Sequence, residues 1–217
     1  MIRVLVVDDE ALIRTGFQRI LDAASGIEVV AAVPGGDAIR TAEEVRPDVV
    51  LLDIRMPDVD GLTVLAALRR QPDPPVVAML TTFDMDEYVE AALRSGAAGF
   101  LLKDTDPEEL PFLVRTLADG GTVLSSKVTR AVVDGYLEAA SPGAATHCLD
   151  RLTDRERDVL VLIAEGLSNA DIAGRMHLST GTVKDHVSAI LTKLEVGGRV
   201  QAALLAQQAG LLKKERE

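Results

Sequence analysis

The 217-residue sequence has no tryptophan, one cysteine and only 3% aromatic residues. The single thiol, Cys148, cannot form a disulfide within the chain, which is typical of a reducing compartment. No apolar run approaches the roughly 18 residues of a membrane-spanning helix. The opening stretch MIRVLVVDDE has too short an apolar run for a signal peptide, and acids follow it directly. We therefore expect a cytoplasmic protein without a membrane partner.

Basic residues are also few, since 23 Lys and Arg accompany 34 Asp and Glu and give a formal net charge of −11. Over the whole chain this charge argues against DNA binding, because an acidic surface repels phosphates. The excess of acidic over basic residues is unevenly distributed along the chain, however. Residues 1–123 carry 22 acidic and 11 basic residues, residues 124–147 carry two of each, and residues 148–217 carry ten of each. The neutral C-terminal part is therefore still compatible with DNA binding.

The first 120 residues alternate short apolar runs with segments of helical periodicity. Continuous apolar runs are typical of parallel strands that helices cover on both faces. Five such repeats predict an α/β domain over residues 1–122, with a doubly wound, five-stranded parallel sheet of the flavodoxin-like kind. The expected strands are Ile2–Val7, Val29–Val33, Val49–Leu52, Val76–Leu80 and Gly99–Leu102.

The pattern changes after residue 122. Residues 123–148 are predicted to be a partly helical linker, with a helix expected between residues 127 and 139. Residues 149–217 contain no strand-like run and predict a small all-α domain. The first expected helix begins at a capping box formed by Thr153 and Glu156 and ends at Gly166. The others are Asn169–Met176, then Thr180–Leu194, which Ser179 caps, and Arg199–Ala209.

Four predicted strand ends carry polar side chains that can act together. Asp8 and Asp9 follow the first strand and Asp53 ends the third, and the carboxyl ends of parallel strands meet at one edge of a sheet. Crowded carboxylates repel unless a cation lies among them, and Mg²⁺ suits an all-oxygen site. Thr81 and Lys103 add a hydroxyl and a positive charge. A lone Asp after a strand is usually a cap, but this combination predicts a phosphoryl site with a carboxylate nucleophile.

The stretches VLVVDDE, LLDIRMPDVDGL, MLTTF and GAAGFLLKD resemble the receiver domain of two-component response regulators over residues 1–120. The resemblance implies that Asp53 is the phospho-acceptor and takes a phosphoryl group from the phosphohistidine of a sensor histidine kinase. It also implies that Asp8, Asp9, Asp53 and the backbone carbonyl of Arg55 hold Mg²⁺.

The same resemblance assigns the switch residues. Thr81 and Lys103 match the residues that bind the phosphoryl oxygens, and Pro57 and Gly61 match the turn that shapes the loop after the acceptor. Phe100 matches an aromatic residue that turns inward when Thr81 moves. Phosphorylation adds negative charge and acceptor oxygens that the hydroxyl of Thr81 and the ammonium of Lys103 can reach. The resulting movement of Thr81 leaves space for Phe100, and this changes the surface of the receiver domain.

The helix expected at Thr180–Leu194 has one apolar and one polar face. Together with the short helix before it and the tight turn between them, it matches a helix-turn-helix, whose second helix enters the major groove. By this spacing alone, a packed interaction domain is the alternative. The polar face carries Gly181, Asp185, Ser188 and Thr192, with Lys184 and Lys193 beside it.

The stretch LTDRERDVLVLIAEGLSNADIAGRMHLSTGTVKDHVSAILTKL resembles the LuxR-type helix-turn-helix, and the whole chain is similar to NarL/FixJ-type response regulators. The resemblance implies that Lys184 is a DNA contact of the recognition helix, that Thr182 and Lys193 contact phosphates, and that the last helix forms a homodimer interface. The dimer residues are then Arg199, Val200, Ala203 and Leu204.

Two positions depart from the family pattern. Asp185 stands where a neutral or apolar residue is common and Ser188 where a basic one is common, so we expect weak phosphate binding and a contact from Asp185 to a cytosine amine. His186 suits core packing at least as well as DNA contact. At most four cations per protomer are expected to contact DNA, so the affinity for DNA should depend only modestly on salt concentration. These cations are Lys184, Lys193, Arg199 and Arg175.

These features predict a regulator of transcription, and not an enzyme, whose partners are a sensor histidine kinase, double-stranded DNA and a second copy of the chain. The unphosphorylated receiver is expected to cover the recognition helix or to block the dimer face. Three alternatives are an orphan regulator without a kinase, a phosphorelay module without DNA, and a haloacid-dehalogenase-like phosphatase. The last requires an Asp-x-Asp nucleophile after the first strand, whereas Asp8 and Asp9 are adjacent.

Overall fold

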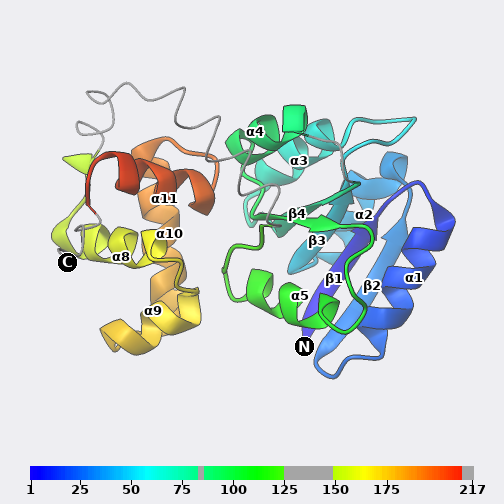
Figure 1. Cartoon of the computed structure of the whole chain (residues 1–217), viewed down its shortest axis with the longest axis horizontal. Helices are drawn as coiled ribbons and strands as arrows, with labels where there is room; N and C mark the ends of the chain where they lie inside the picture. The colour runs from blue at the N-terminus through cyan, green and yellow to red at the C-terminus, as the bar shows by residue number, and fades with distance from the viewer. Residues whose placement is uncertain (83–85, 125–148, 212–217) are drawn as a thin grey trace.

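The computed structural model of the chain describes residues 1–82, 86–124 and 149–211. It contains an α/β domain and a helical domain that lie side by side (Figure 1). The helix expected between residues 127 and 139, and Cys148, lie outside the described residues, so the boundaries at residues 122 and 149 stay predictions.

Five parallel strands form the sheet of the first domain, in the order β2-β1-β3-β4-β5. The predicted doubly wound α/β fold is confirmed, because every predicted apolar run falls within one strand. The strand order reverses between β1 and β3, and such sheets bind ligands at the carboxyl ends of the strands that flank this reversal. The strands are Ile2–Val7 (β1), Ile27–Val33 (β2), Val49–Asp53 (β3), Val76–Thr81 (β4) and Gly99–Leu102 (β5).

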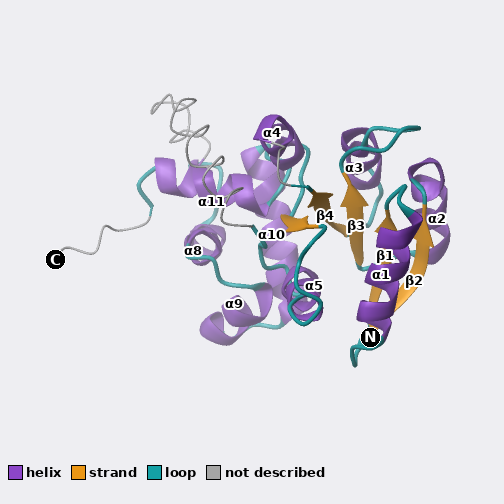
Figure 2. Ribbon diagram, turned by 45° about the vertical axis from the view of Figure 1, so that its right-hand side comes forward, coloured by secondary structure: helices purple, strands orange, loops and turns teal. Residues whose placement is uncertain are grey.

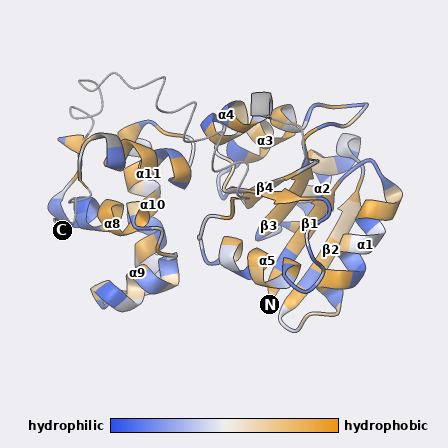
Figure 3. Cartoon of the chain, in the orientation of Figure 1, coloured by the Kyte–Doolittle hydropathy of each residue, from blue (hydrophilic) through white to orange (hydrophobic). Residues whose placement is uncertain are grey.

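Helices cover both faces of this sheet (Figure 2). On one face, α1 (Ala11–Asp22) and α5 (Leu110–Ala118) pack on alternate strand residues. On the other face, the remaining strand residues pack against a second set of helices. Because both faces are covered, the strands are apolar on both sides and appear hydrophobic along their length (Figure 3). This second face is covered by a short 3-10 turn, η1 (Gly35–Asp37), with α2 (Ala38–Val45), α3 (Gly61–Arg69) and α4 (Asp86–Arg94).

The helical domain consists, within the described residues, of four helices around one apolar core. They are α8 (Asp154–Ala164), α9 (Asn169–Met176), α10 (Thr180–Leu194) and α11 (Arg199–Gln208), so the predicted all-α domain is confirmed, with the last helix one residue shorter than expected. None of the helices in the described part of the chain is long and apolar enough to cross a membrane.

Side-chain caps begin three of these helices. The predicted capping box of Thr153 and Glu156 is present, and Ser179 accepts a hydrogen bond from the N–H of Thr182 at 3.0 Å. A second capping box, of Ser168 and Asp171, begins α9 and was not anticipated from the sequence. These caps satisfy backbone N–H groups that otherwise lack a partner in the first turn, and so they fix where each helix starts.

Glu156 also ties the start of α8 to α10, because its carboxylate pairs with Lys193 at 2.6 Å. The hydrogen bonds from Lys193 and from the Thr153 N–H hold the pKa of Glu156 below its ordinary value. A lowered carboxylate pKa means that the stabilisation is complete above the ordinary pKa of Glu and is lost as the pH falls through the lowered value.

We therefore expect Glu156→Gln to lower the free energy of unfolding of the helical domain by about 1 kcal/mol at neutral pH. The measurement is hydrogen exchange of the α8 amides in both proteins, from neutral to acidic pH. The difference between the two proteins should disappear below the lowered pKa, where the wild-type side chain is also neutral. A difference that persists there would contradict the ion pair as its cause.

Candidate functional site

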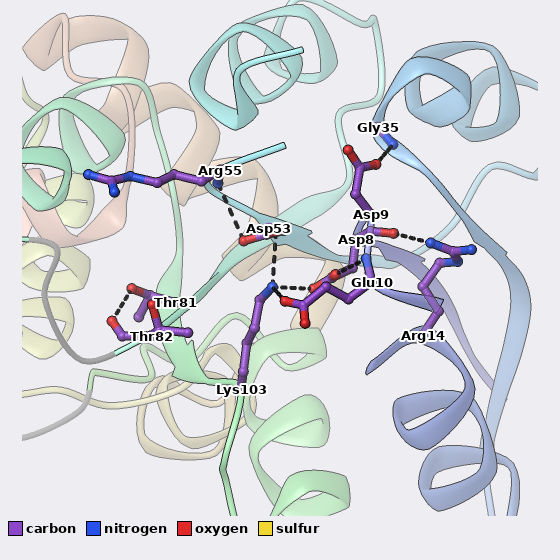
Figure 4. A network of polar contacts seen from close by, with 10 residues as sticks. All are labelled: Asp8, Asp9, Glu10, Arg14, Gly35, Asp53, Arg55, Thr81, Thr82 and Lys103. Carbon is purple, nitrogen blue, oxygen red and sulfur yellow. Dashed lines mark hydrogen bonds and ion pairs between the residues drawn. The ribbon is translucent and has the colours of Figure 1, made fainter. Parts of the chain in front are cut away.

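Two of the three predicted acidic residues, Asp8 and Asp53, meet at the carboxyl ends of β1 and β3, where one ammonium group joins them (Figure 4). The Nζ of Lys103 lies 2.9 Å from Asp8 Oδ2, 2.8 Å from Glu10 Oε1 and 3.0 Å from Asp53 Oδ2. Asp8 and Asp53 are buried, whereas the side chain of Glu10 is 65% exposed. The sequence assigned no role to Glu10, since nothing in its position signals a contact with a residue 93 positions away.

Burial and charge act on this cluster in opposite directions. Burial is the main cause that raises the pKa of Asp53, the charge of Asp8 adds to it, and the hydrogen bond from Lys103 opposes it. Burial on its own would lower the pKa of Lys103, but the hydrogen bonds to Glu10, Asp8 and Asp53 outweigh it and raise that pKa. The ammonium therefore stays charged at neutral pH, and Asp53 is more basic than a solvated aspartate, which favours it as a nucleophile.

The remaining acid, Asp9, points away from this group and accepts a hydrogen bond from the N–H of Gly35 at 3.0 Å. Among the described residues, no set of three or more His, Cys, Asp or Glu side chains is arranged to hold a metal ion. The donor types still fit Mg²⁺, because Asp8, Asp53 and the Arg55 carbonyl offer hard oxygens. In the structure, the ammonium of Lys103 provides the positive charge that these buried carboxylates require.

The hydroxyl of Thr81 donates to the carbonyl of Thr82 at 2.8 Å, and Thr81 lies on the same side of the site as Lys103 (Figure 4). Phe100 is 1% exposed and belongs to the apolar cluster between the sheet, α3 and α4. The sequence predicts that Phe100 turns inward when Thr81 moves. Phe100 is buried while the Thr81 hydroxyl is bound to its neighbour, and the coupled movement of the two residues stays a prediction.

The loop after β3 brings Arg55 and Tyr88 together. The N–H of Arg55 points to Asp53 Oδ1 at 3.4 Å, while its guanidinium lies 5.2 Å from the centre of the Tyr88 ring. Beside this pair is an open cavity of about 600 Å³, lined by residues 54–60 and Tyr88. At the end of the loop, a Cβ on Gly61 would lie 2.2 Å from the carbonyl oxygen of Asp53, so a side chain there would displace the acceptor backbone.

The polar face of α10 is exposed as predicted. Lys184, Asp185 and Ser188 face solvent, whereas His186 is half-buried. Thr182 is half-buried too, and its hydroxyl lies 2.9 Å from that of Ser179. Of the predicted DNA-contacting side chains on α10, those of Lys184, Asp185 and Ser188 are thus exposed.

Three of the four predicted cations are engaged within the helical domain, the first being Arg175, which pairs with Glu165 at 3.3 Å. Lys193 is paired with Glu156, and the guanidinium of Arg199 donates to Asn169 Oδ1 at 2.8 Å and to the carbonyl of Leu167. Burial lowers the pKa of Arg199 to about 10, against a smaller opposing effect of nearby Asp171, so it is charged at neutral pH.

The residues predicted for the dimer interface do not all face solvent. Val200 is 6% exposed and Leu204 is half-buried, and both pack on the apolar cluster of the first domain. Ala203 packs against the core of its own domain. The first domain therefore covers part of the predicted dimer face.

Comparison with known proteins accounts for both halves of the chain. Residues 4–115 match the family model of the response regulator receiver domain, and residues 150–206 match that of bacterial regulatory proteins of the luxR family. The chain is a response regulator of the NarL/LuxR type. The predicted resemblance is thereby confirmed, and the response regulator has a receiver domain and a DNA-binding domain.

Its relatives align along nearly their full length. The transcriptional regulatory protein LiaR of Bacillus subtilis is 36% identical over 213 residues, which cover 98% of this chain and 100% of LiaR. The nitrate/nitrite response regulator NarL of Escherichia coli K12 is 36% identical over 206 residues, 94% of either chain. The solved structure of the response regulator ChrA, from a heme-sensing two-component system, is 34% identical with a TM-score of 0.52 and covers 97% of this chain and 98% of its own.

The acceptor site of the response regulator can be tested through the pKa of Asp53. Lys103→Met should raise this pKa further, because burial and the charge of Asp8 then act without the ammonium that opposes them. Carboxyl carbon NMR of the metal-free protein, titrated with acid, measures the shift. Lys193→Met, the same change in the DNA-binding domain, is the matched control and should leave Asp53 unchanged. An unchanged pKa in Lys103→Met would show that the ammonium does not control Asp53.

Proposed function

We propose that Asp53 is phosphorylated by a sensor histidine kinase and that this phosphorylation controls dimerisation and sequence-specific DNA binding. The observation that supports this most directly is the position of the Asp53 carboxylate at the end of β3, with a raised pKa and with Lys103 at 3.0 Å. As a regulator that binds chromosomal DNA, the protein would act in the cytoplasm.

In the proposed reaction, a carboxylate oxygen of Asp53 attacks the phosphorus of the kinase phosphohistidine. A phosphorus–oxygen bond forms as the phosphorus–nitrogen bond breaks, and the imidazole leaves. Lys103 exchanges part of its contact with the carboxylates for the phosphoryl oxygens, and the hydroxyl of Thr81 exchanges the Thr82 carbonyl for the same group. The slow loss of this group to water returns the regulator to its resting state.

The charge of the transferred group requires neutralisation beyond one lysine. Asp8, Asp9, Asp53 and the carbonyl of Arg55 are the residues that would hold Mg²⁺, which supplies this neutralisation when bound. Asp9 would then give up its hydrogen bond with Gly35.

On the DNA side, α10 would enter the major groove with Lys184, Asp185 and Ser188 toward the bases. Thr182, at the start of the helix, would contact a phosphate. Lys193 is also proposed for phosphate contact, and its pairing with Glu156 would then have to open or be shared. The small number of free cations supports a modest dependence of affinity on salt.

Asp53→Asn should abolish covalent phosphorylation by a small acyl phosphate in the presence of Mg²⁺. The measurement is intact-protein mass together with sedimentation of the treated protein, and the wild type should gain a phosphoryl group and self-associate. Asp58→Asn, which neutralises an exposed acid of the same loop, is the control and should behave like the wild type. If the wild type self-associates and binds DNA equally with and without the donor, the protein is an orphan regulator.

Asp185→Asn should change which bases are preferred, because it removes the carboxylate proposed to accept from a cytosine amine. The loss of one such contact amounts to about tenfold in discrimination. Selection from randomised duplexes, followed by affinity measurement, tests this. Asp158→Asn on the exposed face of α8 is the control for the change in net charge. Unchanged affinity and unchanged preference in Asp185→Asn would refute a base contact.

A further inference from the structure

The ammonium of Lys103 divides its contacts between an exposed carboxylate and two buried ones. It donates to the exposed Glu10 at 2.8 Å and to the buried Asp53 at 3.0 Å. Asp8 Oδ2 lies 2.9 Å from the same nitrogen, yet this buried oxygen has no well-directed hydrogen bond within the described residues. A buried carboxylate oxygen without such a bond is an unused donor for a hard cation. One lysine therefore does not saturate the cluster.

The charges of the cluster lead to the same conclusion. Three carboxylates contact one ammonium, which leaves an excess of two negative charges. A divalent cation on Asp8 and Asp53 balances that excess, provided that the ammonium is kept close by. The ammonium and the metal would compete for the same two carboxylates, because two cations cannot share these oxygens without repulsion. Lys103 thus requires another partner when the metal binds.

Glu10 has the geometry of such a partner. Its backbone is fixed on both sides, since its N–H donates to Asp8 Oδ1 at 2.8 Å and its carbonyl accepts from the N–H of Arg14 at 3.1 Å. Glu10 stands at the N-cap of α1, but its side chain makes no capping hydrogen bond and reaches instead to Lys103. Because the Glu10 side chain is 65% exposed, it can follow the ammonium outward, whereas the buried side chains of Asp8 and Asp53 cannot.

We infer that Glu10 is a positioning residue for the metal site, which holds the ammonium of Lys103 when Asp8 and Asp53 bind Mg²⁺. Glu10 is then not a metal ligand and acts through Lys103. An exposed ion pair is easily given up, so the ammonium stays available for the phosphoryl oxygens. The inference rests on the Mg²⁺ site of the proposed function and adds the residue that allows the lysine to leave that site.

Glu10→Gln should weaken Mg²⁺ binding by about fivefold in the unphosphorylated full chain. Without the metal the ammonium keeps two other partners, whereas with the metal it depends on Glu10, so the substitution costs more in the metal-bound state. The measurement is a Mg²⁺ titration followed by the amide NMR shifts of residues 8–10 and 53–55. Glu28→Gln, which neutralises an exposed acid near the start of β2, is the control and should leave the affinity unchanged.

A double-mutant cycle tests whether Glu10 acts through the lysine. In the Lys103→Met background, Glu10→Gln should weaken Mg²⁺ binding by no more than about twofold, which is the effect of one lost negative charge nearby. An equal loss in both backgrounds would overturn the inference, because Glu10 would then act as a ligand or through its charge alone. An unchanged affinity in Glu10→Gln would overturn it as well.

The Lys103 ammonium itself gives a second readout, which a merely structural role of Glu10 would not change. In the Mg²⁺-saturated proteins, hydrogen exchange of this ammonium should be faster in Glu10→Gln than in the wild type. Equal exchange in both would contradict the proposed pair. Failure of phosphorylation is distinct, because then a small acyl phosphate adds no mass to the wild type while Glu10→Gln still weakens Mg²⁺ binding. A wild type that binds no Mg²⁺ overturns both the metal site and this inference.

Discussion

The ammonium group of Lys103 is the constraint around which the receiver site is organised. Two carboxylates buried side by side repel each other and lose their hydration, so they stay ionised only if a cation lies between them. β5 delivers that cation to the edge where β1 and β3 end. An added phosphoryl group would require the same cation. Of its three partners, Glu10 is the exposed one, so its contact with Lys103 is the least costly to give up.

An apolar cluster on one face of the receiver sheet connects this site to the other domain. Phe100 precedes Lys103 by three residues on the same strand and its continuation, and it lies in the cluster that also contains Val200. A close-packed cluster does not deform continuously, so a shift of β5 would be passed to the surface that α11 contacts. The chemistry and the domain contact are thereby linked through one face of the sheet, the face covered by α3 and α4.

The sequence was sufficient for the strands, the helices and the acidic site, because these follow from local periodicity and from the rule that parallel strands end at one edge. It was insufficient where a side chain has several available partners. Lys193 and Arg199 were expected at DNA as cations, yet folding places them against Glu156 and Asn169. The coverage of Val200 by the receiver was likewise hidden, since an apolar residue on a helix does not reveal which of two surfaces it packs on.

The small extent of the domain contact suits a reversible switch. It consists chiefly of two backbone carbonyls that accept hydrogen bonds, the apolar side chains of Val200 and Leu204, and close backbone approaches at glycines. A phosphoryl group on Asp53 would free the DNA-binding domain only to the extent that it lowers the free energy of the undocked state relative to the docked state. A large apolar interface would exceed what one phosphoryl group supplies, and the domains would then stay docked. Glycines at the helix ends allow the domains to approach closely without burying large side chains at those points.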